Sequence, residues 1–233
     1  MLLDHEKLVF IHIPKCGGSS IEVLLNGDPA VGSHELPDRM VLSTHRNLFP
    51  MGRHATYREY RDYLRERGRR IEDYAVFTLV RCPYEILPSQ YEHWNRIIAR
   101  NERYPGLVSR RARIGHALFY TNFTVHCARK WVGRYIQKRL RFIPSFEFYL
   151  TGSREGEIRV FRLEDLAEDS RPLLDYLGRH GIEAEGLPHF NRSKAIRGGR
   201  ELRPIQRWIA TRIYRQELLR FYPERLEHAP GNA

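Results

Sequence analysis

The stretch that decides the fold, residues 10–21, reads FIHIPKCGGSSI. Its first residues belong to a mostly apolar run over residues 8–13, which is bounded by Pro14. This run is too short for a helix and therefore predicts a buried strand. A loop with two glycines follows, and Ser19 and Ser20 then stand where a helix begins. Backbone N–H groups at such a helix start point outward with a partial positive charge. The stretch therefore predicts a strand, loop and helix that suit an anion.

This loop differs from the Walker A pattern, G-x-x-x-x-G-K-[ST], because Lys15 precedes Gly17 and Gly18 instead of following them. The glycines let the backbone approach oxygen atoms closely, and Lys15 adds a mobile positive charge. A tight structural turn capped by serine is the alternative interpretation. A P-loop kinase also needs a Mg²⁺-binding hydroxyl after its lysine and an acidic strand end, and the sequence offers neither convincingly.

The rest of the chain alternates between strand-like and helix-like patterns, which predicts an α/β fold with a mostly parallel central sheet flanked by helices. The length of 233 residues suits a single domain over 1–233, with a basic helical insertion at about 95–144. Further strands are expected over 40–43, 74–80 and 158–163, and further helices over 57–70, 85–101, 114–140, 164–180 and 204–221.

Composition narrows the class of protein. Three cysteines exclude a disulfide scaffold and favour a reducing compartment. The sequence has no run of 18 apolar residues, so no transmembrane segment is expected, and the charged N-terminus lacks the apolar core of a signal peptide. A cytoplasmic protein is the expectation. The net charge of +11 is concentrated in residues 96–141, which form either a solvated helical face or a surface that binds polyanions.

Residues 12–20, HIPKCGGSS, resemble the 5′-phosphosulfate loop of sulfotransferases that use 3′-phosphoadenosine-5′-phosphosulfate (PAPS). The branch with carbohydrate sulfotransferases such as the heparan 2-O-sulfotransferases typically shows H-I-P-K-T-G-G-[TS]-S here. The chain is identified as a soluble, bacterial-type member of that branch. Cys16 stands where threonine is usual, and the backbone contacts of the loop should survive this change.

A second motif follows a later predicted strand. Residues 78–91, TLVRCPYEILPSQY, are similar to the family's 3′-phosphate motif, R-x-P-x(5)-S-x-Y. Arg81 would hold the phosphate with its two-pronged guanidinium, and Ser89 would be the second anchor. Asn191 and Ser193 lie in a segment that resembles the family's L-P-x-x-N-x-S. Departures include Cys82, where aspartate is frequent.

The resemblance implies a P-loop-kinase-like sulfotransferase fold and transfer of the sulfuryl group from PAPS to an acceptor hydroxyl, with PAP as product and no metal required. The acceptor hydroxyl would belong to a carbohydrate or glycolipid. Lys15 would stabilise the leaving phosphate oxygen, and His45, after the predicted strand 40–43, would be the general base. His12 is interpreted as a core histidine. The residues implied to bind the cofactor are Pro14, Lys15, Cys16, Gly17, Gly18, Ser19, Ser20, Arg81, Ser89, Asn191 and Ser193.

The basic segment lies outside the cofactor motifs, so an acceptor that is itself anionic is expected to meet it. The candidate contacts are Arg46, Arg110, Arg111 and Arg113. Peripheral contact with a membrane is left open. Nucleic acid is not an expected partner, and no metal-binding spacing of cysteine or histidine is present. The alternatives are a PAPS- or PAP-binding protein with impaired catalysis and, less favoured, a nucleic-acid-binding protein.

Overall fold

The computed structural model describes residues 1–26, 50–103, 122–135, 145–188 and 202–226. The predicted strand over 40–43 and much of the predicted helix over 114–140 lie outside these residues. The chain forms two compact units, which are described separately. One comprises residues 1–81 and 146–192, and the other comprises residues 82–145 and 193–233.

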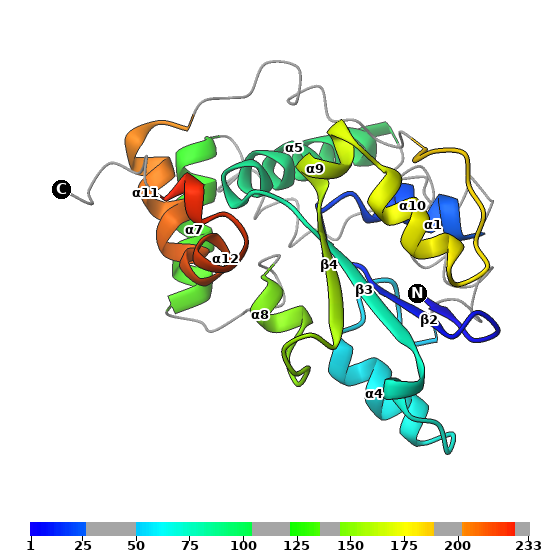
Figure 1. Cartoon of the computed structure of the whole chain (residues 1–233). Helices are drawn as coiled ribbons and strands as arrows, with labels where there is room; N and C mark the ends of the chain where they lie inside the picture. The colour runs from blue at the N-terminus through cyan, green and yellow to red at the C-terminus, as the bar shows by residue number, and fades with distance from the viewer. Residues whose placement is uncertain (27–49, 104–121, 136–144, 189–201, 227–233) are drawn as a thin grey trace. The chain divides into compact units, whose positions relative to one another are not determined.

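A four-stranded mixed sheet forms the centre of the first unit (Figure 1). Its order is β1-β2-β3-β4, and β1 pairs antiparallel with β2, whereas β2, β3 and β4 run parallel to one another. The expected α/β class is confirmed. The strands span Leu2–Leu3 (β1), Leu8–Ile11 (β2), Ala75–Val80 (β3) and Ile158–Arg162 (β4).

Aromatic side chains fill one face of this sheet. The rings of Phe10 on β2 and Phe77 on β3 lie 5.0 Å apart between centroids, because these two residues are register partners. Tyr176 of helix α10 (Arg171–Gly178) packs against Phe77 at 5.7 Å and against Phe161 of β4 at 5.6 Å. Helix α10 therefore covers this face and closes the core of the first unit.

The other helices of the first unit differ from the expected ones mainly in where they end. The expected helix over 57–70 stops at Arg65, because Gly68 takes a left-handed conformation with φ of 67°. The expected helix over 164–180 is divided, because the proline after Arg171 fits only the first turn of a new helix. The remaining elements are α1 (Gly18–Asn26), α4 (Tyr57–Arg65), η1 (Ile71–Asp73), α8 (Phe146–Tyr149) and α9 (Leu163–Glu168).

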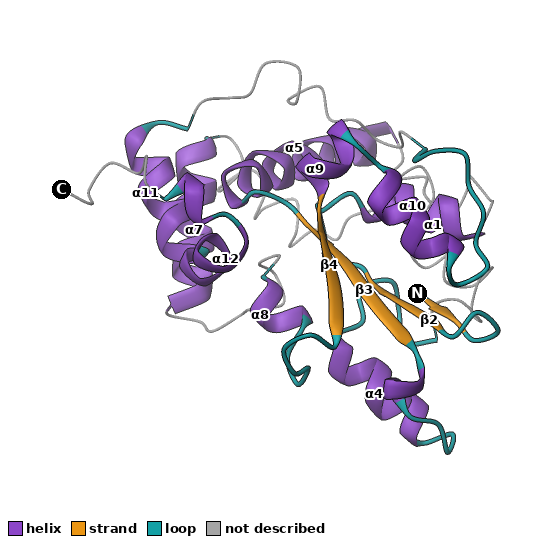
Figure 2. Cartoon of the chain, viewed as in Figure 1, coloured by secondary structure: helices purple, strands orange, loops and turns teal. Residues whose placement is uncertain are grey.

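In the second unit every described element is a helix (Figure 2). The elements are α5 (Pro83–Arg103), α7 (Phe123–Tyr135), α11 (Pro204–Ile213), α12 (Arg215–Phe221) and η4 (Pro223–Arg225). Two side-chain hydrogen bonds tie α11 to its neighbours. The Tyr84 hydroxyl lies 2.9 Å from that of Thr211, and the Gln206 amide donates to the Thr124 hydroxyl at 2.9 Å. No helix within the described ranges has the length and apolar character needed to cross a membrane.

The Phe77 ring is the point where β2, β4 and α10 converge, so we expect Phe77→Ala to lower the free energy of unfolding by about 3–5 kcal/mol. Phe148→Ala removes the same ring from a half-buried position of α8 and should cost less than half as much. Urea unfolding of both variants tests this. Equal losses would contradict the assignment of Phe77 to the centre of the core.

Candidate functional site

The carboxyl ends of three parallel strands meet at one edge of the sheet. The strand β2 leads into the loop over residues 12–17, β3 leads into Arg81, and β4 leads into Leu163. The Arg81 guanidinium donates to the Lys15 carbonyl with a distance of 3.4 Å between nitrogen and oxygen. The first and second sequence motifs thus begin side by side, at the edge of an α/β sheet where ligands usually bind.

The loop itself has an unusual backbone. Lys15 has a φ of 70° and Gly17 a φ of 82°, so both lie in the left-handed region. A lysine in this region costs about 1–2 kcal/mol, and such local strain is characteristic of functional sites. The Cys16 amide donates to the Ile13 carbonyl at 3.3 Å, and the Ser20 amide donates to the Gly17 carbonyl at 3.1 Å. The loop is thereby closed tightly onto the start of α1.

The amides between these two hydrogen bonds form the candidate anion site. In the part of the chain that the structure describes, no group accepts a hydrogen bond from the amides of Gly17, Gly18 or Ser19. Amides at the first turn of a helix carry the positive end of its dipole. Lys15 and Ser20 are partly exposed beside them. This arrangement can bind a sulfate or phosphate group.

Two glycines are required for the loop to lie this close to its surroundings. A Cβ atom on Gly18 would stand 2.1 Å from Cδ2 of the buried His12 ring. A Cβ atom on Gly17 would stand 2.7 Å from a methyl group of Leu163. The backbone of the loop therefore rests directly on the end of β2 and the start of α9.

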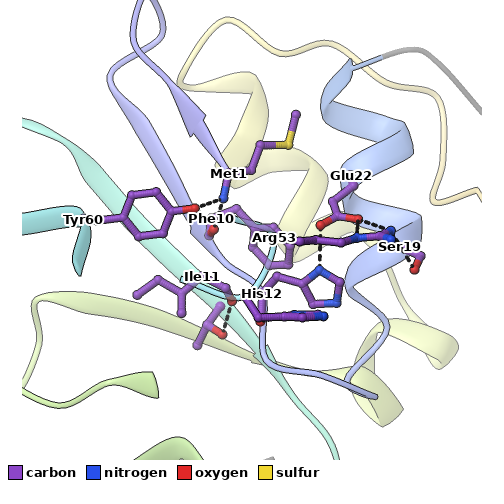
Figure 3. A network of polar contacts seen from close by, with 10 residues as sticks. Met1, Phe10, Ile11, His12, Ser19, Glu22, Arg53 and Tyr60 are labelled. Carbon is purple, nitrogen blue, oxygen red and sulfur yellow. Dashed lines mark hydrogen bonds and ion pairs between the residues drawn. The ribbon is translucent and has the colours of Figure 1, made fainter. Parts of the chain in front are cut away.

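A buried ionic network lies beneath the loop (Figure 3). Glu22 of α1 is completely buried, and its carboxylate oxygens lie 2.6 Å from Nδ1 of His12 and 2.7 Å from Nε of Arg53. Arg53 also reaches the Ser19 hydroxyl at 3.4 Å. Burial alone raises the pKa of Glu22, but His12 and Arg53 outweigh burial and hold the pKa at about 2. Glu22 is therefore ionised, and a buried charge of this kind needs such partners.

Burial lowers the pKa of His12, although the nearby Glu22 opposes the shift. His12 is therefore neutral, and its Nδ1–H donates to the Glu22 carboxylate. Both side chains are buried and bound to each other, as expected for core residues and not for groups that meet a substrate. Their contribution to the site is to hold α1 and the loop against the sheet.

His54 is a candidate site residue that the sequence did not reveal. Its Nδ1 lies 3.1 Å from the His12 carbonyl, and because a carbonyl only accepts, Nδ1 carries the proton. Nε2 is then the basic nitrogen of a partly exposed ring that packs edge-on against His12, with 4.4 Å between centroids. Burial, followed by the proximity of His12, lowers the pKa of His54 to about 3. With 11 histidines in the chain, only the tertiary contact with His12 distinguishes His54.

The Cys16 side chain faces the interior. It is 1% exposed, and burial raises the pKa of its thiol to about 12. The thiol is therefore protonated and unreactive at neutral pH. The Cys16 amide is bonded to the Ile13 carbonyl, and its side chain points away from solvent.

The remaining predicted site residues have different placements. Ser89 is buried in α5, in the second unit. The rest lie outside the described residues, and they are His45, Arg46, Arg110, Arg111, Arg113, Asn191 and Ser193. Within the described ranges, no three side chains of histidine, cysteine, aspartate or glutamate are grouped to hold a metal ion.

Comparisons with protein-family models, curated proteins and solved structures find no match to this chain.

The contact between Gly18 and His12 gives a direct test of the loop geometry. We expect Gly18→Ala to destabilise the fold by about 1–3 kcal/mol or more, because the added methyl group overlaps the His12 ring. Gly178→Ala in α10 is the matched control, since nothing lies within 4 Å of its added Cβ and alanine favours a helix by about 0.5–1 kcal/mol. Urea unfolding should show a lower free energy of unfolding for Gly18→Ala and a higher one for Gly178→Ala. A Gly18 variant as stable as the wild type would refute the close approach.

The neutral state of His54 makes stability depend on pH. In the unfolded chain this imidazole takes up a proton near pH 6.5, whereas in the folded chain it does so only near pH 3. The unfolded state therefore binds more protons between these values, and the free energy of unfolding should fall as the pH falls below 6.5, by at most about 1.4 kcal/mol per unit for this group. His54→Gln should reduce that slope, and an unchanged slope in urea unfolding across pH would contradict the assignment.

Proposed function

We propose that the chain is a PAPS-dependent sulfotransferase of the P-loop-kinase-like type, a single domain that transfers the sulfuryl group to an acceptor hydroxyl. One observation carries the proposal. The residues HIPKCGGSS form a strand-to-helix loop with left-handed Lys15 and Gly17, and the arginine of the second motif donates to that loop. Two motifs predicted separately to bind the two phosphate-bearing ends of PAPS thus begin at one sheet edge.

The first motif would bind the 5′-phosphosulfate. The amides of Gly17, Gly18 and Ser19 can donate to its oxygens, and the start of α1 supplies a partial positive charge. Pro14, Cys16 and Ser20 would shape the same loop. At the other end of the cofactor, Arg81 would pair with the 3′-phosphate, with Ser89, Asn191 and Ser193 as further predicted contacts.

The reaction requires little covalent participation by the protein. The acceptor oxygen attacks sulfur, the bond from sulfur to the PAP phosphate oxygen breaks, and the hydroxyl proton passes to a base. Positioning and charge stabilisation supply most of the acceleration. The Lys15 ammonium would neutralise the leaving phosphate oxygen. Transfer from PAPS is proposed to proceed without a metal ion.

Two histidines are candidates for the base. His45 is proposed from the family resemblance. His54 is proposed from its geometry, because its Nδ1–H is anchored on the His12 carbonyl and its Nε2 has a lone pair to accept a proton. The negative charge of bound PAPS would raise the pKa of a nearby imidazole from its low value, which brings it closer to the range useful for general base catalysis.

The acceptor is proposed to be a hydroxyl of a carbohydrate or glycolipid that the protein meets in the cytoplasm. Arg46, Arg110, Arg111 and Arg113 would contact anionic groups on it. A protein that binds PAP without transferring sulfate is the second candidate, favoured by the departures Cys16 and Cys82 from the family motifs. Transfer assays separate the two.

The decisive experiment is transfer of labelled sulfate from PAPS across a panel of hydroxyl acceptors, with PAP binding measured alongside. Lys15→Ala should lose transfer, whereas Lys7→Ala, the matched change at a second left-handed lysine, should retain it. Transfer in the Lys15 variant equal to that in the Lys7 variant would overturn the loop assignment.

The same assay identifies the base. His45→Ala and His54→Ala should both bind PAP, and the variant that lacks the base should transfer sulfate about 10²–10⁴-fold more slowly. If both variants keep full transfer, neither histidine is the base. Binding of PAP without any transfer by the wild type would favour the catalytically impaired alternative.

A further inference from the structure

The second unit exposes large apolar side chains on two consecutive helices. Ile205 is 52% exposed, Trp208 is 43% exposed and Leu219 is 55% exposed. The first two lie on α11 and the third on α12. Only one other large apolar side chain among the described residues is comparably exposed, Val125 on α7. Three of four such side chains thus belong to the α11–α12 segment, residues 202–226.

This segment is also strongly basic. Residues 202–226 contain six arginines against two glutamates, and one of these glutamates, Glu217, is buried and accepts a hydrogen bond from Ser145 at 2.7 Å. The exposed positions include Arg203, Arg215 and Arg220, none of which forms an ion pair with a described residue. The outer surface of the segment therefore carries an excess of positive charge.

Several exposed arginines of the first unit, in contrast, lie next to carboxylates. On α4, Arg58 and Arg65 lie 3.8 and 3.3 Å from the Asp62 carboxylate, and Arg154 lies 3.9 Å from that of Glu157. These side chains are solvated ion pairs, which are common on protein surfaces. The α11–α12 segment is thus distinguished by unbalanced arginines combined with exposed apolar groups.

Helix α11 is amphipathic, and one side of it is buried within the second unit. Gln206, Ile209, Ala210 and Ile213 are buried. Ile205, Trp208 and Arg212 follow at spacings of three and four residues, which places them on one outward stripe. The Arg212 guanidinium lies 5.5 Å from the centre of a Trp208 ring. The stripe therefore presents an aromatic ring, an aliphatic side chain and a cation together.

We propose that the α11–α12 segment is a docking surface for a bilayer rich in anionic phospholipid. Tryptophan prefers the boundary between lipid headgroups and acyl chains, and arginine can place its stem against apolar groups while its guanidinium meets phosphate. Each arginine near an anionic membrane surface contributes about 1 kcal/mol. The proposal is independent of the cofactor site.

Lipid fits this surface better than other polyanions do. A nucleic acid could bind the arginines through its phosphates and stack one base on Trp208, but it has no apolar surface to bury Ile205 and Leu219. A protein partner requires a surface of matched shape, whereas a bilayer accepts a single exposed helix stripe. Charge complementarity and the scattered apolar side chains together select the bilayer.

Vesicle cosedimentation of the full chain tests the proposal. The wild type should bind vesicles that contain phosphatidylglycerol and should not bind vesicles of phosphatidylcholine alone. The triple variant Arg203→Gln, Arg215→Gln, Arg220→Gln should bind roughly 100-fold more weakly, at about fivefold for each charge. The matched triple variant Arg58→Gln, Arg65→Gln, Arg154→Gln removes the same net charge from paired positions and should bind like the wild type.

The apolar contribution needs its own comparison. The double variant Ile205→Ser, Trp208→Ser should weaken vesicle binding about tenfold or more, whereas Val125→Ser should leave it unchanged. A second measurement uses the conservative variant Trp208→Phe, which should leave the fold intact. Lipids with brominated acyl chains should quench the tryptophan fluorescence of the wild type more than that of this variant. Equal quenching would contradict insertion of this ring.

Three outcomes would overturn the proposal. They are absence of binding to either kind of vesicle, equal losses in the two triple arginine variants, and tighter binding to random duplex DNA that depends on the same arginines but not on Ile205 and Trp208. The last outcome would identify the segment as a nucleic-acid surface.

Discussion

The buried carboxylate of Glu22 is the constraint on which the loop region depends. A charge removed from water is tolerated only when its oxygens are paired, so the fold must bring His12 and Arg53 to it. These partners come from the end of β2 and from the segment before α4, while Glu22 itself lies one turn inside α1. One buried carboxylate, with an ion pair to Arg53 and a hydrogen bond from His12, therefore fixes three separate segments around the start of the first helix.

The loop takes its shape from this arrangement. The His12 ring, held by Glu22, leaves room for no side chain at position 18, and the backbone of Gly18 rests against it. Lys15 enters the left-handed region to complete the turn, with its carbonyl held by Arg81. The result is a row of amides at the sheet edge that these contacts hold in place. Donors positioned in advance in this way can stabilise charge without rearranging.

The strands and the loop could be predicted from the sequence because their signals are local. Apolar runs that end at Pro14 and Pro83 mark β2 and β3, and the glycines after Lys15 mark the turn. The two-residue β1 is too short to leave a periodic pattern. The role of Arg53 and the placement of His54 were not predictable, because both depend on contacts with a residue more than 30 positions away in the chain. Such contacts leave no trace in spacing or composition.

We propose above all that the loop at the end of β2, together with Arg81, binds the phosphate-bearing nucleotide. Amide hydrogen exchange of the full chain with and without PAP tests it most directly, because the proposed donors are themselves backbone amides. We expect slower exchange over residues 15–20 and at Arg81 when PAP is added, with α4 unchanged. Exchange over residues 15–20 that PAP does not alter, under conditions where PAP is bound, would contradict this assignment.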